Sequence, residues 1–366
     1  MRKPNQLEPN YAVPPGATLL ETIESLGMSQ AELASRMGRP LKTINEIVKG
    51  KAAITPETAL ELEKVLGAPA SFWNNAERNY RETLARLENE RQLEREVAWA
   101  RQFPYAEMAK RGWVPGANAG VQRVQALLRF LGIASTEQWA TFSLQTQGAY
   151  RESRSFQSDS YALGCWLRQG ELAAQKIACA PFSETAFRSA LQEARTLTAA
   201  PPEQAEQRLR ELCAASGVAF VVVPEIKGTH VSGVTRWLHP AKALIQQSLR
   251  HKTDDHFWFT FFHEAGHILL HGKKAVFLEF NGITDPKEAE ADQFARNCLI
   301  ASAEWDAFLK AGRPTQASVR ALARKLRIAP GIVVGRLQHD RIIPHSHFNE
   351  LRTTLRLTPS AARVSP

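Results

Sequence analysis

The sequence has few cysteines and no long apolar run, and each absence narrows the class of protein. Its four cysteines are widely spaced in 366 residues and form no C-x-x-C pair, so we expect buried thiols rather than a disulfide framework or a thiolate zinc site. No stretch reaches the roughly 18 uninterrupted apolar residues of a membrane-spanning helix. The first residues, MRKPNQLEPNYAVPPG, lack the apolar segment of a secretory signal. We therefore expect a cytoplasmic protein with no membrane partner.

Length and charge indicate several domains and a polyanionic partner. A chain of 366 residues exceeds what one hydrophobic core usually organises. It carries 46 lysines and arginines against 37 aspartates and glutamates, a formal net charge of +9. This excess favours nucleic acid over a membrane surface as the partner.

Periodicity and capping residues predict an α+β chain that is mainly helical. Short helices are expected first, then a long charged helix from about Glu82 to Arg101. Runs rich in β-branched residues at 218–224, 233–237 and 243–247 predict a small sheet. The predicted order is an N-terminal arm with short helices at 1–80, a helical connecting region at 81–200, a domain with the small sheet and further helices at 205–302, a helical subdomain at 303–356 and a disordered tail at 357–366.

Residues 28–50, MSQAELASRMGRPLKTINEIVKG, predict a helix-turn-helix. Two helices flank a short turn that contains glycine, and their apolar residues form a shared packing face. Asparagine and threonine can read base edges, whereas arginine and lysine hold phosphates. The alternative is a small helical bundle that binds protein. Because one module reads two half-sites only as a dimer, we expect a homodimer. The residues expected to contact double-stranded DNA are Gln30, Arg39, Lys42, Thr43, Asn45, Glu46 and Lys49.

Residues 261–271, FFHEAGHILLH, contain the motif H-E-x-x-H. Histidines four apart lie on one face of a helix, so His263 and His267 can bind one Zn²⁺ through their imidazole nitrogens. Glu264 is rotated by about 100° from His263, and its carboxylate can still reach a metal-bound water. Zinc lowers the pKa of such a water, and the carboxylate can take its proton. The motif therefore predicts a catalytic zinc site with Glu264 as general base.

A catalytic zinc site needs a third protein ligand. The position six residues after His267, where one class of zinc peptidase has a histidine, is Lys273. His271 lies a full turn beyond His267, and we expect it to support the ligands or line the groove rather than bind the metal. His271, His256 and Arg236 are also the candidates for stabilising an oxyanion, although a structural role is the simpler expectation for each.

The helix predicted at 286–300 offers the third ligand. Glu288 and Asp292 are four residues apart and share a face, so one carboxylate can bind zinc while the other accepts the free N–H of a ligand histidine. Glu290 is the competing ligand, but it lies about 200° from Glu288 around the helix, so both cannot face the metal. We favour Glu288 as the ligand and Asp292 as the partner of a histidine.

These residues resemble two known families. Residues 28–87 resemble HigA-type antitoxins of the Cro/C1 helix-turn-helix class, above all in ITPETALELEKVLG at 54–67 and the Phe72-Trp73 pair that follows. Residues 209–300, with HEAGHILLH and EAEADQFA, look like the ImmA/IrrE family of metallopeptidases. Fusions of these two modules form a known architecture, so the resemblance extends over nearly the whole chain.

The resemblance implies a fold and a function. It implies a five-helix Cro/C1-type domain and a zincin-like domain whose gluzincin-like site has His263, His267 and Glu288 as ligands and Glu264 as general base. Members of the peptidase family cleave repressors, and HigA-type proteins repress their own promoters and neutralise a toxin. We therefore predict a transcriptional regulator of toxin–antitoxin or stress-response type that cleaves a protein partner or itself. The alternative is an antitoxin that neutralises a cognate toxin by binding, with a zinc site that does not hydrolyse.

Overall fold

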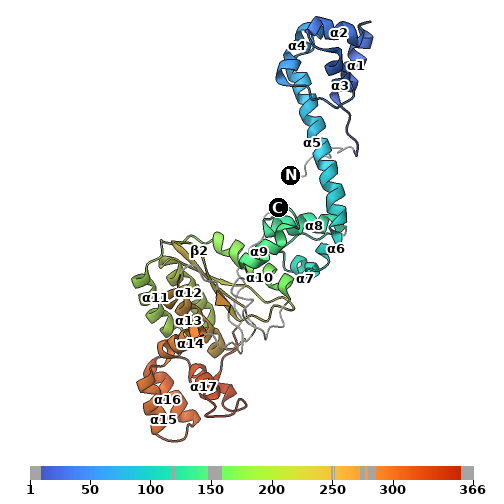
Figure 1. Ribbon diagram of the computed structural model, residues 1–366. Coiled ribbons are helices and arrows are strands. Elements are labelled where there is room, and N and C mark those ends of the chain that lie inside the picture. The colour runs from blue at the N-terminus through green and yellow to red at the C-terminus, as the bar shows by residue number, and fades with distance from the viewer. Residues whose placement is uncertain are drawn as a thin grey trace. The chain divides into compact units, whose positions relative to one another are not determined.

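The structure, a computed structural model, separates into two compact units, Met1–Val97 and Ala98–Pro366 (Figure 1). The finer domain borders predicted near residues 80, 200 and 302 stay predictions, and the predicted tail at 357–366 lies outside the described residues. The structure describes residues 10–117, 120–146, 159–248, 250, 252–272, 277–278 and 286–355.

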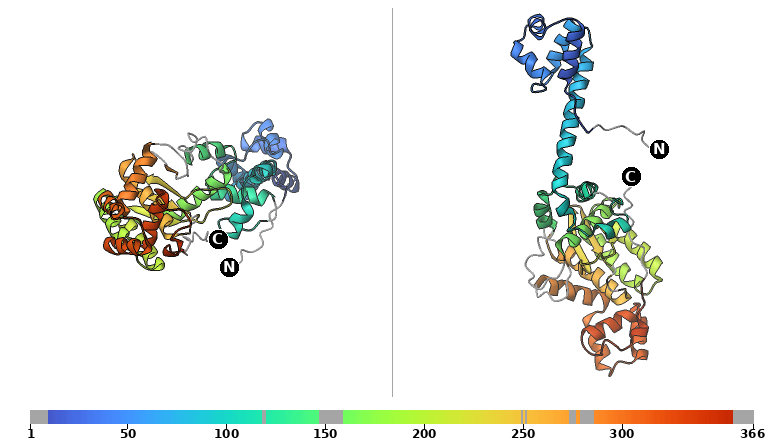
Figure 2. Two further views of the ribbon diagram at one scale, coloured as in Figure 1. Left: turned by 90° about the horizontal axis from the view of Figure 1, so that it is seen from below. Right: turned by 90° about the vertical axis from the view of Figure 1, so that its right-hand side faces the viewer.

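The first unit is a bundle of four short helices joined to a long one, and the long helix extends out of the bundle in Figure 2. Capping residues mark the ends of its second helix: the Ser29 hydroxyl accepts a hydrogen bond from the amide of Glu32, and Gly38 ends the helix in the left-handed conformation. The predicted five-helix N-terminal domain is therefore confirmed. Its helices are α1 (Pro15–Ser25), α2 (Gln30–Met37), α3 (Leu41–Val48), α4 (Pro56–Leu66) and α5 (Ala70–Arg95).

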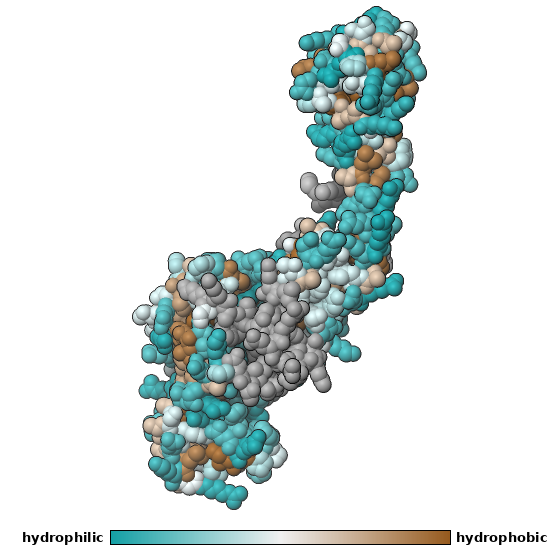
Figure 3. Space-filling model, viewed as in Figure 1, coloured by the Kyte–Doolittle hydropathy of each residue, from teal (hydrophilic) through white to brown (hydrophobic). Residues whose placement is uncertain are grey.

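The long helix α5 begins earlier than the sequence predicted. It starts at Ala70 rather than Glu82, because Gly67 already ends α4 and Trp73 is fully buried in the core of the bundle. The charged stretch is only the later part of this helix, and the surface of α5 is mostly hydrophilic in Figure 3. Ion pairs one turn apart accompany it, Arg81 with Glu77 at 2.7 Å and Arg86 with Glu90 at 3.1 Å.

The second unit contains a sheet and the remaining helices of the chain. The three predicted strands are confirmed, and together with the helices they make the mainly helical α+β class that the sequence predicted. The strands are β1 (Val218–Val222), β2 (Gly233–His239), β3 (Lys242–Gln247) and β4 (Phe277–Leu278). The helices are α6 (Val97–Ala100), which begins at the border of the units, α7 (Tyr105–Lys110), α8 (Gly120–Leu131), α9 (Gln138–Thr146), α10 (Ser160–Gln175), α11 (Glu184–Leu197), α12 (Pro202–Ala215), α13 (Asp254–Leu270), α14 (Pro286–Leu299), α15 (Ser302–Lys310), α16 (Gln316–Leu326), α17 (Pro330–His339) and a short 3₁₀ helix, Asn349–Leu351.

The sheet is mixed and has both faces covered. Its strand order is β1-β3-β2-β4, with β1 parallel to β3 and β2 antiparallel to both of its neighbours. Every residue of β1 is buried, which explains its uninterrupted apolar sequence. Side chains alternate between the two faces. On one face Phe220 packs edge-to-face on Phe261 of α13, and on the other the Gln246 amide donates to the carbonyl of Trp166 in α10.

The C-terminal helices pack against the start of α13. A Cβ added at Gly331 of α17 would lie 2.4 Å from Oδ1 of Asp254, and one added at Gly335 would lie 2.6 Å from Oδ2 of Asp255. These two glycines therefore allow α17 to approach the aspartates closely. Asp255 also forms an ion pair with Arg352, which lies just after the 3₁₀ helix. Helices α16 and α17, which lie in the predicted C-terminal helical subdomain, thus contribute to the core that holds α13.

The buried carboxyl group of Asp254 is expected to make the free energy of unfolding depend on pH. Burial raises the pKa of Asp254 to about 6, although amide hydrogen bonds from Thr353 and Asp255 oppose the shift. Between pH ~4 and ~6 the folded chain therefore holds a proton that the unfolded chain releases. The free energy of unfolding falls as pH rises through this window, by up to about 3 kcal/mol for a shift of about two pKa units.

The variant Asp254→Asn tests this prediction. Both amide hydrogen bonds end on Oδ1 of Asp254, so the oxygen of an asparagine can accept them without carrying a charge. We expect the variant to gain stability relative to the wild type as pH rises from about 4.5 to 7, by about 2–3 kcal/mol. Urea unfolding at several pH values measures the difference. A difference that does not change with pH would contradict the account.

Candidate functional site

The H-E-x-x-H motif lies on α13, a helix packed between the sheet, α14 and α17. Phe261 and Phe262 are fully buried next to the motif, and His263, Glu264 and His267 are each at most 1% exposed. A run of aromatic residues on several sides of the helix explains this burial, because they leave no face of its central turns to solvent. The polar residues of the motif are therefore enclosed by the fold rather than carried on its surface.

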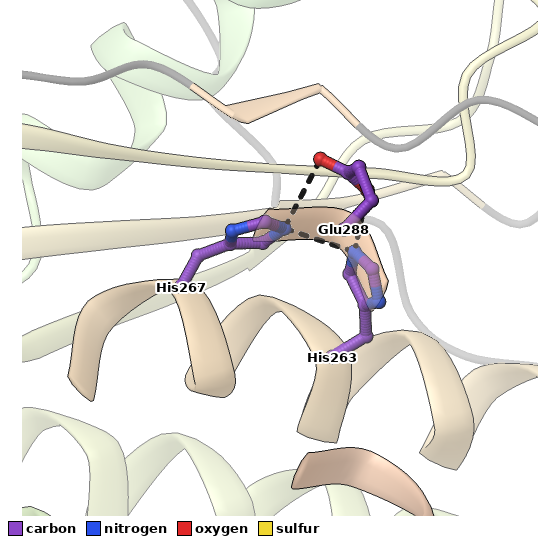
Figure 4. A group of neighbouring side chains, drawn as sticks. All are labelled: His263, His267 and Glu288. Atoms are coloured by element: carbon purple, nitrogen blue, oxygen red, sulfur yellow. Dashed lines mark hydrogen bonds and ion pairs between the residues drawn. The ribbon is translucent and has the colours of Figure 1, made fainter. Parts of the chain in front are cut away.

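Three ligand atoms converge between α13 and α14 (Figure 4). Nε2 of His263 lies 3.1 Å from Oε2 of Glu288, and Nε2 of His267 lies 3.4 Å from Oε1 of the same carboxylate. The two histidine Nε2 atoms are 3.0 Å apart. A tetrahedral zinc with bonds of about 2.0–2.2 Å places its ligand atoms about 3.3 Å from one another. The donor set and its spacing therefore fit a metal ion of this size.

The structure separates Glu288 from its predicted competitor. Glu288 contacts both histidines of the motif, whereas Oε2 of Glu290 lies 3.1 Å from Nε2 of His271 and its side chain is 62% exposed. Residues two positions apart on a helix point in directions that differ by about 200°. Only one of these glutamates can therefore point at the histidine pair. Glu288 occupies the position expected of a third ligand.

Both histidines of the pair are held at the ring nitrogen that faces away from the cluster. Nδ1 of His263 lies 2.9 Å from Oδ1 of Asp292, and Nδ1 of His267 lies 2.9 Å from Nδ1 of His271. A proton on each of these Nδ1 atoms leaves the lone pair of Nε2 directed at the cluster, the form that binds a metal. Asp292 and His271 thus lie where the sequence analysis expected supporting residues.

The contact between His271 and Glu290 was not predicted. His267 contacts His271 through their Nδ1 atoms, and His271 in turn contacts the carboxylate of Glu290 on α14. The spacing of four residues between the two histidines indicates that their rings are neighbours. That signal could have suggested that His271 needs a second partner, and hence a role for Glu290 other than as a ligand.

The pKa shifts favour the protonation states that bind a metal. Burial raises the pKa of Glu288, but hydrogen bonds and charges from His263 and His267 outweigh this effect and lower the pKa to about 2. Burial lowers the pKa of His267 and outweighs the hydrogen bond from Glu288, which acts in the opposite direction. A carboxylate and a neutral imidazole are therefore the forms present near neutral pH.

Glu264 is buried at the contact between α13 and β2. A Cβ added at Gly233 would lie 2.4 Å from Oε1 of Glu264 and 2.8 Å from Cγ2 of Thr260. The missing side chain at this strand position therefore leaves the space that the carboxylate occupies. The Thr235 hydroxyl donates to the carbonyl of Glu264 at 3.0 Å and fixes the helix against the strand. Sequence reasoning missed Gly233 and Thr235, because their role depends on a contact between distant segments.

The variant Gly233→Ala is expected to disturb Glu264 more than the metal ligands. The added methyl group enters space that the Glu264 carboxylate fills, and we expect the free energy of unfolding to fall by about 1–3 kcal/mol. Zinc binding should persist, because Gly233 is not among the residues that converge on the cluster. Chemical unfolding and zinc content of the purified protein measure the two effects. An unchanged stability would contradict the proposed close approach.

Arg236 does not join the cluster. Residues 233 and 235 of β2 face α13, so Arg236 faces the opposite side of the sheet, where it donates to the carbonyl of Leu167 at 3.0 Å and lies 3.4 Å from Glu171. His256 lies on α13 two turns before His263. The structural role expected for Arg236 therefore accounts for its contacts, and the structure gives it no position beside Glu264.

The residues predicted to contact DNA lie around α3 and the turn before it. Ile44 and Ile47 of α3 are buried, while the side chain of Lys42 is 85% exposed. Lys49 is exposed as well, and the remaining predicted residues of α3 are partly exposed: Thr43, Asn45 and Glu46. Gln30, at the start of α2, is also partly buried. The polar face predicted for α3 therefore exists, and its contacts with DNA stay a prediction.

Arg39 has a partner that the sequence analysis did not foresee. Its Nε lies 2.5 Å from Oε2 of Glu61 in α4, and its Nη2 lies 3.2 Å from Oε1. The predicted phosphate contact must therefore share or replace this ion pair. Among the residues that the structure describes, the acidic partner of Lys42 is Glu46, whose Oε1 lies 3.8 Å from the Lys42 Nζ. Lys42 is thus the more available of the two cations for a phosphate.

Comparisons with known proteins find two domains. Residues 19–73 match a helix-turn-helix family, and residues 245–338 match the IrrE N-terminal-like domain of the M78 peptidases. The chain is 41% identical over 59 residues to virulence-associated protein A of Dichelobacter nodosus, which is 16% of this chain and 58% of that protein. It is 36% identical over 61 residues to the uncharacterized HTH-type transcriptional regulator YddM of Escherichia coli strain K12, 17% of this chain and 65% of that one.

A solved structure resembles one part of the chain in sequence. It is an addiction module antidote protein of the HigA family from Coxiella burnetii, 31% identical, with a TM-score of 0.22 over 23% of this chain and 94% of that one. The chain spans less than two thirds of the length of the two curated relatives. Within the described residues no helix is long and apolar enough to cross a membrane. The chain therefore joins a helix-turn-helix domain to an IrrE N-terminal-like domain that holds a cluster of two histidines and a glutamate.

Proposed function

We propose that this protein is a DNA-binding regulator whose second unit is a zinc-dependent peptidase that cleaves a protein partner or the chain itself. One observation carries the proposal: Nε2 of His263, Nε2 of His267 and the carboxylate of Glu288 converge at the spacing of zinc ligands. The H-E-x-x-H order places Glu264 directly after the first of these histidines. The match to the IrrE N-terminal-like domain supports the same function.

The residues of the site have three different roles: binding the metal, transferring a proton and orienting the ligands. His263, His267 and Glu288 would hold the zinc, which when bound supplies a Lewis acid that polarises a carbonyl and lowers the pKa of water. Glu264 accepts the proton of the attacking water and returns it to the departing amine. Asp292 and His271 orient the imidazoles of His263 and His267 through their Nδ1 atoms.

The helix-turn-helix domain would bind the protein to an operator on DNA. The polar face of α3, with Lys42 and Asn45, is suited to the major groove, where asparagine reads adenine and lysine contacts phosphate or guanine. We expect a homodimer that occupies two half-sites of an operator, and we expect it to act in the cytoplasm. Cleavage of a regulatory partner, or of the chain, would then change the expression of the genes it controls.

Removal and return of the metal test this function. The protein is co-expressed with the products of neighbouring genes, and cleavage is followed by mass spectrometry. o-Phenanthroline, which chelates zinc, should abolish cleavage, whereas its non-chelating isomer m-phenanthroline should not, and added Zn²⁺ should restore it. If the protein holds zinc and cleaves neither a neighbour nor itself, it is better described as a zinc-stabilised antidote that acts by binding a toxin.

A further inference from the structure

A hollow lies beside the metal cluster and is not used by the chemistry described above. It encloses about 570 Å³, including its open mouth, between α13, α14 and α17. His256 and Phe259 of α13, Arg296 and Leu299 of α14, and Ile332 and His339 of α17 line it. These residues come from three helices that pack on one another, so the hollow is formed by the core of the unit rather than by a surface loop.

The hollow lies next to the metal cluster, on the same side of it along both α13 and α14. Phe259 lies one turn before His263, and their ring centroids are 6.3 Å apart. Arg296 lies one turn after Asp292, the partner of His263. One helical turn rises about 5.4 Å, which is the length of roughly two residues of an extended peptide. A peptide bond held at the cluster therefore brings a side chain one to three residues away to this hollow.

The walls of the hollow are apolar. Leu299 is 5% exposed and Ile332 is 4% exposed, and the ring of Phe259 stacks on that of His339 with centroids 6.4 Å apart. Burying a leucine or isoleucine side chain in such a site removes apolar surface from water and stabilises the complex. The apolar lining thus fits an aliphatic side chain.

The rim carries a positive charge. Among the described residues no carboxylate forms an ion pair with Arg296, whose Nη2 lies 3.5 Å from Nε2 of His339. The other charged groups at the hollow are already engaged. Asp255 pairs with Arg352, and the Arg336 guanidinium donates to the carbonyl of Ile300 at 2.6 Å. The carboxylate of Asp340 lies 3.7 Å from Arg336 and 3.3 Å from His339. Arg296 is therefore the cation available to an occupant, and an acidic group complements it.

We propose that this hollow is a substrate-binding subsite that takes an aliphatic side chain flanked by an aspartate or glutamate, whose carboxylate pairs with Arg296. The proposal rests on the peptidase function proposed above and adds the class of substrate. It makes α17, from the C-terminal part of the chain, a wall of the substrate groove. A basic residue beside the aliphatic side chain would meet Arg296 and be disfavoured.

Peptide binding tests the subsite without requiring cleavage. The probes are fluorescent, glycine-flanked peptides with a central Leu-Glu, Leu-Gln, Leu-Lys or Ala-Glu, added to the full-length zinc-loaded Glu264→Gln variant. We expect Leu-Glu to bind about tenfold more tightly than Ala-Glu and about two- to fivefold more tightly than Leu-Gln. Combining that variant with Arg296→Glu should reverse the order of Leu-Glu and Leu-Lys. Arg320→Glu, which changes an exposed arginine of α16, is the matched control and should leave the order unchanged.

The outcomes separate the subsite from the peptidase function. Equal binding of all four peptides, no measurable binding, or the same order of affinities with and without Arg296→Glu would overturn the subsite. If the peptides bind in the expected order but the wild type cleaves nothing, the subsite stands and hydrolysis fails. If the wild type cleaves proteins at sites without an aliphatic–acidic pair, the peptidase function stands and the subsite fails.

Discussion

The Glu264→Gln variant is expected to keep its zinc and to lose cleavage by about 10²–10⁴-fold, the usual contribution of a general base. Glutamine has nearly the shape of glutamate, so it fits the buried space beside Gly233 that the carboxylate occupies. It cannot accept a proton from water at neutral pH. Cleavage rates and zinc content of the same preparation measure the two properties together.

The matched control for this variant is Glu290→Gln. It removes one carboxylate from the same region, but from a side chain that is 62% exposed and contacts His271 rather than the zinc-ligand atoms. We expect it to reduce cleavage by about tenfold at most, the lower end of the range for residues that orient metal ligands, because its side chain is largely exposed. Equal losses in the two variants would contradict the assignment of Glu264 as the base.

The Gly16→Ala variant is expected to destabilise the first unit. The added Cβ would lie 2.1 Å from the carbonyl oxygen of Ile47 and 2.6 Å from Cα of Val48. These are backbone atoms, so the clash cannot be relieved by a side-chain rotation. Overpacking of this kind costs about 1–3 kcal/mol and exceeds the gain of about 1 kcal/mol from replacing glycine by alanine in a helix. The result should be a lower unfolding temperature of the first unit and weaker DNA binding.

Zinc content separates this effect from general misfolding. The metal cluster belongs to the second unit, so the Gly16→Ala protein should still bind zinc. Gly116→Ala is the matched control, because a Cβ there meets nothing within 4 Å, and it should preserve both properties. Normal DNA binding by Gly16→Ala would show that α1 and α3 do not approach each other as closely as described.

Features set by local sequence were predictable. Ser29 and Gly38 mark the ends of α2, and the β-branched runs gave the three longer strands. The helical spacing of His263 and His267 places two imidazoles on one face whatever surrounds the helix. The same geometry showed that Glu288 and Glu290 cannot both face the metal, and the preference for Glu288 rested on its spacing of four residues from Asp292.

Features that depend on distant contacts were not predictable. The early start of α5 depends on the burial of Trp73 in the bundle. The two residues of β4 pair with β2 but are too few to show a periodicity. Nothing local indicates that Gly233 makes room for Glu264, or that Arg39 is held by Glu61. Each of these contacts joins segments whose pairing the sequence pattern does not specify.

The zinc content of three proteins tests the central claim most directly. Wild type, Glu288→Gln and Glu290→Gln are purified in parallel, dialysed against a weak chelator and analysed by elemental mass spectrometry. The account predicts about one zinc per chain in the wild type and in Glu290→Gln, and little zinc in Glu288→Gln, because only Glu288 contacts both histidines of the motif. A wild type without zinc, or a loss of zinc in Glu290→Gln but not in Glu288→Gln, would contradict it.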